Sequence, residues 1–175
     1  AMSAQPAPDA PQAEVALGDF LDDARVVIDL DVASRKRLFE RMAKLAASRG
    51  DGPGLDSVLS ALTQREKLGS TGIGNGIALP HGRMDGFAEP LIAVARLKRA
   101  IHYDAPDGAP VWLAACLLAP ADANGMHLRL LAALAERFNS PEFRARAQRA
   151  RSAAELASLF RGEPPGENAN GAAAK

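Results

Sequence analysis

The sequence lacks the features that mark several large protein classes. Among its 175 residues there is a single cysteine, Cys116, so no disulfide can form within the chain. Cys116 lies in the apolar run 111–119, which indicates a buried, reduced thiol. Lysine and arginine total 21, as do aspartate and glutamate. The chain therefore has no net charge that would favour binding to nucleic acid or to an anionic membrane.

Long hydrophobic runs are also missing. The longest apolar run is about half the length that a membrane-spanning helix needs. The sequence does not open with a positively charged stretch followed by an apolar one, as a secretory signal would. These absences predict a cytoplasmic protein without membrane insertion.

The composition predicts one domain between two disordered ends. Residues 1–13 are rich in alanine, proline and glutamine and show no periodicity, which predicts a disordered arm. Residues 162–175 contain prolines, asparagines, glycines and a short alanine run, which predicts a disordered tail. Residues 14–161 contain no internal linker or repeat and are long enough for a single hydrophobic core.

Within that domain, segments typical of strands and of helices alternate. Short β-branched or apolar runs predict strands at 25–30, 77–79, 91–97 and 111–118, with another starting at 101–103. Helical spacing and capping residues predict helices after Ser34, over 55–68, after 124–125, after Ser140-Pro141 and over 152–160. The sequence therefore predicts an α/β fold, a single domain with a mixed β-sheet covered by helices on both faces.

The most informative stretch is 65–82, in which a glycine-rich turn leads to a short strand and then to His81. Pro80 cannot donate a ladder hydrogen bond, so we expect the strand to end there and to present His81 at its end. Gly82 would leave room beside the imidazole. Two interpretations of His81 are open at this point: a reactive side chain that a large partner can reach, or a capped histidine in a turn.

Arg65 lies on the apolar stripe of the helix over 55–68, three residues after Leu62. A guanidinium in that position needs an anion. The anion is either a carboxylate elsewhere in the fold or a phosphoryl group near His81.

The other two histidines are His102 and His127. The three histidines are 21 and 25 residues apart, without the close pair that metal sites usually contain, so the sequence gives only a weak indication of metal. His127 lies in the first turn of a helix, where it either bonds to backbone or lies close to a bound anion. His102 is expected in a surface loop. The glycines Gly72, Gly74 and Gly76 lead into a strand rather than a helix, which argues against a nucleotide site. They are expected instead to let the backbone turn tightly and approach a phosphoryl group through its N–H groups.

The stretch resembles the active-site signature of the type-2 EIIA proteins of the bacterial phosphotransferase system, and most closely their nitrogen-regulatory branch, EIIA-Ntr. It covers eighteen residues with fixed spacing, and a looser resemblance extends over about 30–160. The matching residues are Arg65-Glu66, Ser70-Thr71-Gly72-Ile73-Gly74 and Gly76-Ile77-Ala78-Leu79-Pro80-His81-Gly82-Arg83.

The resemblance implies a phosphotransferase component with no cofactor and no metal. His81 would accept and pass on a phosphoryl group, with the tele nitrogen, Nε2, as the candidate position. Arg65 and His127 would bind the phosphoryl oxygens, because a histidine followed by leucine, here His127-Leu128, opens the corresponding helix in the family. Ser70 or Thr71 would help to orient the histidine or the arginine.

The resemblance also implies partners. The phosphoryl donor would be the nitrogen-branch carrier protein NPr, and the phosphorylation state would regulate proteins such as potassium transporters or sensor kinases. The alternative within the family is a sugar-specific EIIA, of the fructose or mannitol type, that passes phosphate to an EIIB. A purely structural protein is the remaining alternative.

Overall fold

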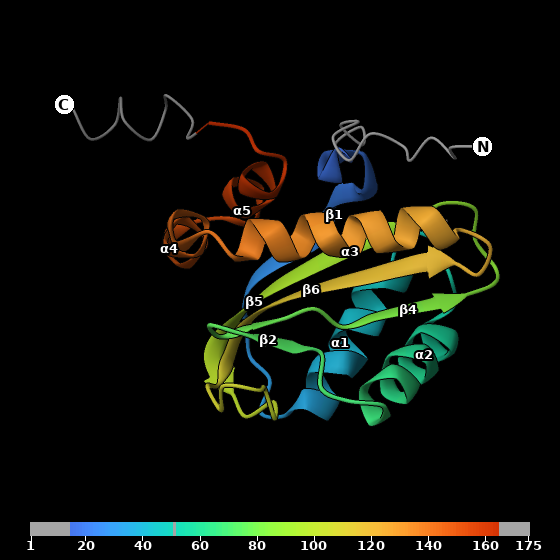
Figure 1. Ribbon diagram of the computed structural model, residues 1–175, viewed down its shortest axis with the longest axis horizontal. Helices are drawn as coiled ribbons and strands as arrows, with labels where there is room; N and C mark the ends of the chain where they lie inside the picture. Colours follow the sequence, from blue (N-terminus) through green and yellow to red (C-terminus); the bar gives the residue numbers. More distant parts are fainter. Residues whose placement is uncertain (1–14, 51, 165–175) are drawn as a thin grey trace, which may run out of the picture.

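The computed structural model describes residues 15–50 and 52–164, which form a six-stranded mixed sheet with helices on both faces. Its strand order is β1-β5-β6-β3-β2, and β4 also pairs with β6 (Figure 1). The strands are β1 (Leu21–Leu30), β2 (Gly72–Gly74), β3 (Ile77–Ala78), β4 (His81–Met84), β5 (Leu91–Ile101) and β6 (Val111–Pro120). The pairs β5–β6 and β2–β3 are antiparallel, whereas β1–β5, β3–β6 and β4–β6 are parallel. The mixed, covered sheet that the sequence predicts is therefore confirmed.

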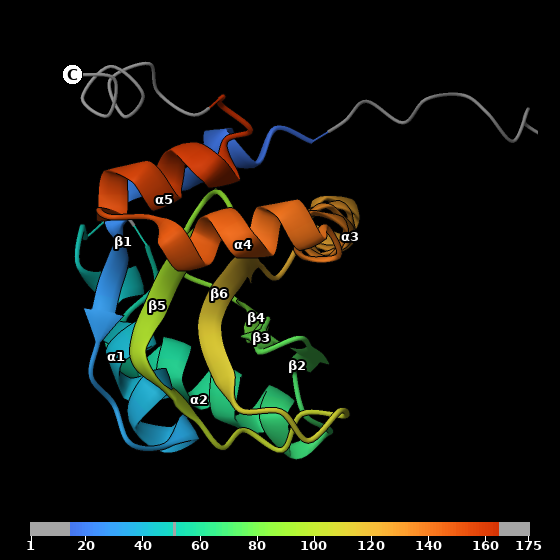
Figure 2. The same cartoon turned by 90° about the vertical axis from the view of Figure 1, so that its left-hand side faces the viewer.

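Two layers of helices enclose the sheet (Figure 2). One layer contains α1 (Arg35–Ala47) and α2 (Leu55–Lys67). The other contains η1 (Leu17–Phe20), α3 (Asn124–Phe138), α4 (Pro141–Arg149) and α5 (Ala153–Phe160). Each layer closes its own hydrophobic core against one face of the sheet. Among the described residues, no helix is both long and apolar enough to span a membrane.

The strand β6 runs through the middle of both cores. Because side chains alternate across a strand, Leu113 and Leu117 pack under α3, whereas Cys116 and Leu118 pack under α1 and α2. All four are fully buried, and each buried leucine stabilises the fold by about 1.5–3 kcal/mol. Burial also raises the pKa of the Cys116 thiol to about 12, so it stays protonated. The expected buried, reduced cysteine is confirmed.

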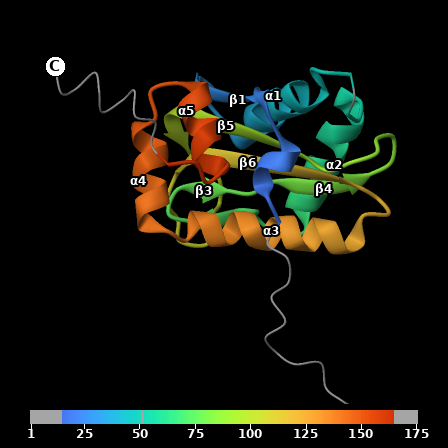
Figure 3. The same ribbon diagram turned by 90° about the horizontal axis from the view of Figure 1, so that it is seen from above.

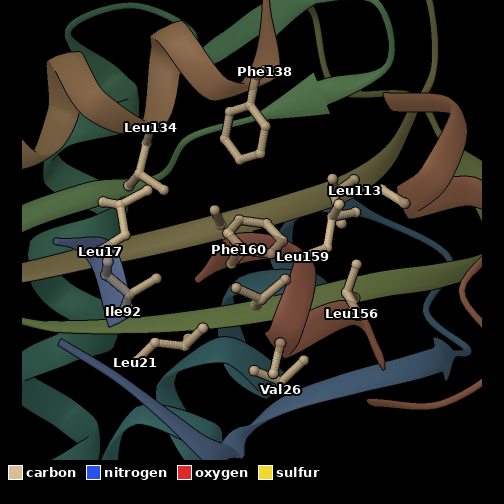
Figure 4. Packing of buried hydrophobic residues seen from close by; sticks show 14 of the residues in the cluster. Leu17, Leu21, Val26, Ile92, Leu113, Leu134, Phe138, Leu156, Leu159 and Phe160 are labelled. Carbon is tan, nitrogen blue, oxygen red and sulfur yellow. The ribbon is translucent and has the colours of Figure 1, made fainter. Parts of the chain in front are cut away.

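The core under α3, α4 and α5 is closed by three aromatic rings, of which Figure 4 labels Phe138 and Phe160. Phe138, Phe143 and Phe160 come from α3, α4 and α5, and their ring centroids lie 5.2–5.7 Å apart in edge-to-face pairs. Aromatic rings prefer this arrangement because the positive edge of one ring meets the negative face of the next. It fixes α4 and α5 against the end of α3.

Side-chain caps set the starts of three helices, and those at Ser34 and Ser140 are the caps that the sequence predicts. The hydroxyl oxygens of Ser34, Ser140 and Ser152 each accept a hydrogen bond from the backbone N–H three residues later. Pro141 occupies the first turn of α4, where its missing N–H costs nothing. The serine caps and Pro141 are thus enough to locate these helix starts from the sequence.

One predicted strand is wrong. The segment 101–103 does not begin a new strand, because β5 continues through the polar residues 98–99 and Ile101 still pairs with Val111. Tyr103 follows in a loop, yet only 1% of its surface is exposed. The charged side chains of 98–99 interrupt the apolar pattern, and the pairing with β6 shifts register between Arg96 and Ile101, but the strand continues.

The predicted arm over 1–13 and most of the predicted tail over 162–175 lie outside the described residues. The first residues of that tail close α5: the N–H of Gly162 donates to the carbonyl of Leu159, and that of Glu163 to Ser158. Gly162 has a φ of +74°, the left-handed conformation that ends many helices.

Candidate functional site

His81 lies at a break in the edge of the sheet. The strand β3 ends at Ala78, two residues before Pro80, which has no N–H to donate. The carbonyl of Pro80 still accepts from the N–H of Leu117, so the chain stays alongside β6 and pairing resumes with His81 opposite Leu117. The histidine thus opens β4 rather than closing β3. The expectation of a histidine at a strand end is corrected, because the sheet continues past the proline.

The imidazole of His81 is held at both nitrogens. The Nε–H of Arg65 lies 3.2 Å from Nε2, and the carbonyl oxygen of Leu79 lies 2.8 Å from Nδ1. A guanidinium can only donate, so Nε2 must accept and the proton of a neutral ring must be on Nδ1, where it donates to Leu79. The contacts therefore fix the tautomer and leave the lone pair on Nε2.

Electrostatics also keep this ring neutral. Burial lowers the pKa of His81 below its ordinary value of 6.5, and the charge of Arg65 lowers it further. The bond to Leu79 and the charge of Glu66 act in the opposite direction without reversing the shift. At pH 7 the ring is neutral, as a nucleophilic imidazole must be.

Arg65 reaches the ring from the last turn of α2. Its Nη1 also donates to the carbonyl of Gly69, at 2.9 Å, which fixes the side chain against the end of its own helix. The strand β4 packs against α2, so the strand that carries the imidazole and the helix that carries the guanidinium are in direct contact. Of the two partners considered for Arg65, a carboxylate does not bind it among the described contacts; its side chain donates there to His81 and to the Gly69 carbonyl.

His127 approaches His81 from the other helical layer, at the start of α3, which runs beside β4 and β3 (Figure 3). The two ring centroids are 5.7 Å apart. His127 is 7% exposed, and its Nδ1 is buried without a hydrogen-bond partner among the described residues. Burial lowers its pKa, as do the neighbouring His81 and Arg83. A neutral imidazole carries one N–H, so His127 can donate one hydrogen bond to a group bound beside His81.

Ser70 and Thr71 do not bond to the imidazole within the described part of the chain. The hydroxyl of Ser70 accepts from the N–H of Gly72 at 3.1 Å, and the hydroxyl of Thr71 lies 2.6 Å from a carboxylate oxygen of Glu66. Thr71 is linked to His81 indirectly, because its carbonyl accepts from the N–H of Leu79 at 2.9 Å.

Gly82 is required for close packing rather than for space beside the ring. A Cβ added there would lie 3.0 Å from the Cβ of Ala61 on α2. Gly74 and Gly76 form the β2–β3 hairpin, where both have positive φ, at the opposite end of β3 from His81. The N–H of Asn75 between them donates to Asp107 at 2.9 Å. The hairpin glycines therefore shape that turn and do not present the Asn75 N–H to a phosphoryl group.

Glu66 belongs to the motif, and the structure gives it contacts that were not predicted from the sequence. Its carboxylate binds both the backbone and the hydroxyl of Thr71, and it also accepts from Arg35. The signal was present, because Glu66 follows Leu62 by four residues and so continues the apolar stripe of α2 more directly than Arg65 does.

A metal centre finds no support among the described residues. No group of three histidine, cysteine or acidic side chains that could hold an ion occurs in that part of the chain. His102 is in the loop after β5, and its side chain is 84% exposed. Its Nε2 lies 2.7 Å from a carboxylate oxygen of Asp104. The prediction that His102 is a surface residue is confirmed.

Residues 19–162 match the model of the phosphoenolpyruvate-dependent sugar phosphotransferase system EIIA 2 family. This match covers most of the chain, so the chain belongs to the type-2 EIIA family, whose members take part in phosphoryl transfer.

Its relatives in that family include nitrogen regulatory proteins. The nitrogen regulatory protein of Pseudomonas aeruginosa is 38% identical over 142 residues, which cover 81% of this chain and 92% of the relative. The crystal structure of nitrogen regulatory protein IIA-Ntr from Neisseria meningitidis superimposes with a TM-score of 0.78 at 39% identity and covers 82% of this chain and 98% of that one. The chain is thus a homologue of IIA-Ntr.

The same fold occurs in a more distant protein. The mannitol enzyme IIA of Escherichia coli, solved in complex with phosphorylated enzyme IIB, has a TM-score of 0.65 at 16% identity. That alignment covers 82% of this chain and 99% of the mannitol protein. At this level of identity the likeness concerns the fold alone.

Proposed function

We propose that the protein carries a phosphoryl group on Nε2 of His81 and that its phosphorylation state regulates partner proteins. The observation that supports this most strongly is the arrangement around one imidazole. Arg65 faces Nε2, Leu79 holds the proton on Nδ1, and His127 lies beside the ring with an unsatisfied nitrogen. Each of these features suits a neutral nucleophile that has to receive a dianion.

In the proposed reaction, the Nε2 lone pair attacks the phosphorus of a phosphohistidine on the donor protein. A P–N bond forms at His81 while the donor's P–N bond breaks, and its electron pair returns to the donor imidazole. Because Nδ1 keeps its proton, the His81 ring becomes cationic, and the carbonyl of Leu79 stabilises that charge. The transition state is loose, so positioning and charge are the main contributions that the protein can make.

Arg65 has to change partners during this step. Its Nε–H bonds to the same lone pair that attacks, so that bond must break as the phosphoryl group arrives. The guanidinium can then bind two phosphoryl oxygens, for which its planar fork is suited. His127 donates to another oxygen through its ring. Neither residue has to form a covalent bond.

The surface near the site suits a protein donor. Few large apolar side chains are exposed in the described residues, and two of these flank site residues: Leu68 follows Arg65 by three positions and is 84% exposed, and Leu128 follows His127 directly and is 67% exposed. Exposed apolar side chains of this kind often mark protein interaction sites. We propose that a carrier of the NPr type docks over them and delivers the phosphoryl group.

The relatives favour a regulatory role over the sugar-specific alternative, because nitrogen regulatory proteins match over more of the chain than the fructose-specific EIIA component of Haloferax volcanii, which is 36% identical over 102 residues. We propose potassium-transport proteins and sensor kinases as the class of regulated partner. A protein that receives its phosphoryl group from such a carrier would act in the cytoplasm.

The first prediction tests the acceptor. The purified protein, incubated with phosphorylated NPr-type carrier and a chelator, is expected to gain one acid-labile phosphoryl group, seen by intact-mass measurement. His81→Ala is expected to gain none, because it removes the nucleophile. His102→Ala is the matched control, since it removes an exposed histidine outside the site. Uptake by His81→Ala at the wild-type rate would refute the assignment, and a requirement for added Zn²⁺ or Mg²⁺ would revive a metal site.

A further inference from the structure

Glu66 is a nearly buried carboxylate next to Arg65, and the mechanism above does not use it. Its side chain is 6% exposed. One oxygen accepts from the N–H of Thr71 at 3.0 Å and from Arg35 at 3.2 Å, and the other accepts from the hydroxyl of Thr71 at 2.6 Å. Hydrogen bonds to an ionised acceptor are stronger than neutral ones, so Thr71 is held firmly and in one orientation.

Tyr103 completes the environment of Thr71. Since the threonine hydroxyl donates its proton to Glu66, the Tyr103 hydroxyl, 2.8 Å away, must donate to the threonine oxygen. Burial raises the pKa of Tyr103, so that proton remains in place. Arg35 binds the other end of the same residue, by donating to the Tyr103 carbonyl at 2.8 Å. The direction of donation is therefore fixed: the Tyr103 hydroxyl donates to Thr71, and the Thr71 hydroxyl donates to Glu66.

From Thr71 the chain of hydrogen bonds leads to the reactive ring. The carbonyl of Thr71 accepts from the N–H of Leu79 at 2.9 Å, and the carbonyl of Leu79 accepts from Nδ1 of His81 at 2.8 Å. Leu79 lies between β3 and β4, in the short segment where Pro80 interrupts pairing with β6. There the link to Thr71 supplies a backbone constraint that the interrupted ladder lacks.

We propose that Glu66 is a positioning residue: through Thr71 and Leu79, its carboxylate holds the His81 ring in the orientation and tautomer that leave Nε2 unprotonated and facing Arg65. The inference rests on the proposed role of His81 as the phosphoryl acceptor. Both contacts to the imidazole then begin at adjacent residues of α2, with Arg65 at one nitrogen and Glu66, indirectly, at the other. A shift of α2 would change both contacts together.

The effect of Glu66→Gln follows from hydrogen-bond inventory. The amide oxygen of glutamine can still accept from one Thr71 group, but its nitrogen is a donor and cannot accept from the other. The Thr71 hydroxyl would have to reverse, and it would then meet the hydroxyl proton of Tyr103. Thr71→Val removes the hydroxyl donor at similar volume, whereas Thr71→Ser keeps it. The three variants therefore separate the hydrogen bond from packing.

The test measures the ring and the reaction separately. Two-bond ¹H–¹⁵N spectra, which distinguish protonated from unprotonated ring nitrogens, are expected to show the Nδ1–H tautomer of His81 in the wild type and in Thr71→Ser. Glu66→Gln and Thr71→Val are expected to show a mixture of tautomers or broadened signals. In single-turnover assays, the maximal transfer rate should fall by about 10- to 100-fold, as expected for a misplaced nucleophile, with the half-saturating carrier concentration unchanged.

Glu155→Gln is the matched control. Its carboxylate also accepts a backbone N–H, that of Arg151 at 2.8 Å, but on α5. It should leave the tautomer and the transfer rate at wild-type values. Wild-type spectra together with wild-type rates in folded Glu66→Gln and Thr71→Val would overturn the proposal, as would loss of thermal stability alone. A fall in rate without a change in tautomer would equally contradict it.

The two proposals fail in different ways. If His81→Ala still accepts phosphate, the proposed function is wrong, whatever Glu66 does. If His81→Ala is inactive but the tautomer does not depend on Glu66, only the positioning role is wrong.

Discussion

At the scale of single residues, the site separates one permanent charge from two neutral rings. Arg65 carries its charge at any physiological pH and donates two bonds, whereas burial lowers the pKa values of both His81 and His127. The two histidines can therefore lie 5.7 Å apart without repulsion between cations. Because Arg65 is charged and His127 is neutral, we expect their removal to slow phosphoryl transfer by unequal amounts.

The second prediction concerns that inequality. Arg65→Ala and His127→Ala should slow single-turnover transfer by roughly 10- to 1,000-fold each, with Arg65 at the upper end because it is charged and grips two oxygens. Arg65→Lys should recover only part of the rate, since an ammonium lacks the fork. Circular dichroism checks that each variant folds. Near-wild-type rates in folded Arg65→Ala and His127→Ala would exclude both residues from the site.

The third prediction is that stability falls in mild acid because of the two histidines. Above pH 6.5, the ordinary histidine value, both rings are neutral in the folded and the unfolded chain. Below it, the unfolded chain takes up protons first, since the folded pKa values are lowered, and folded stability is lost. The thermal midpoint should drop as the pH falls from about 7 to about 5.

The control for this effect is the double variant His81→Asn with His127→Asn, which should flatten the pH dependence in that range. Carboxylates contribute their own acid sensitivity at lower pH, and that part should persist in the variant. A midpoint that drops equally in both proteins would show that the two histidines do not titrate with lowered pKa values.

At the scale of secondary-structure elements, the contact between α2 and β4 sets the distance between Arg65 and His81. Gly82 lets the strand approach the helix, because its missing Cβ would lie 3.0 Å from Ala61 and 3.6 Å from Met84. Ala61 belongs to α2, which carries Arg65, and Met84 belongs to β4, which carries His81. The glycine is therefore a spacer between the two elements.

The fourth prediction is that Gly82→Ala destabilises the protein by about 1–3 kcal/mol through overpacking. It should also slow transfer, because α2 has to move away from β4 and carries Arg65 with it. Thermal or chemical denaturation measures the first effect and single-turnover assays the second. Gly125→Ala, in α3, is the control: an added Cβ there meets nothing within 4 Å, so both quantities should stay near wild type.

Most elements were predictable because their signals are local. Serine caps fixed the helix starts, and the apolar run of β6 indicated a strand covered on both faces. The short strand β4 was missed, since His81–Met84 carries no apolar alternation and pairs only because β6 runs beside it. Tyr103 was missed for a similar reason, because its partner Thr71 is 32 residues away along the chain.

At the scale of the whole molecule, the proposed docking face draws on two layers of the fold. Leu68 is the C-cap of α2 on one side of the sheet, and Leu128 lies near the start of α3 on the other. Figure 1 shows β4 between these two helices, so a carrier that covers both leucines would also lie over this edge strand. The sequence could not reveal this face, because it arises only when α2 and α3 pack on opposite sides of the sheet. His81, Arg65 and His127 meet there for the same reason.

The fifth prediction is that Leu68→Asp and Leu128→Asp raise the carrier concentration needed for half-maximal transfer by at least about tenfold each, as loss of a central apolar contact does. The maximal rate should change little, because neither side chain touches the imidazole in the described contacts. Leu55→Asp is the control: Leu55 is also exposed, but it lies at the opposite end of α2. Equal effects of all three changes would point to general destabilisation instead of docking.

The burial of Cys116 has a practical consequence for such measurements. The only thiol of the chain is fully enclosed, and its pKa of about 12 leaves almost no thiolate at neutral pH. A maleimide dye should therefore ignore the native protein and react only with a cysteine introduced at the surface. A fluorophore attached to a surface cysteine near Leu68 and Leu128, but outside the proposed contact, would report binding of the carrier as it happens. Cys116 would not have to be removed first.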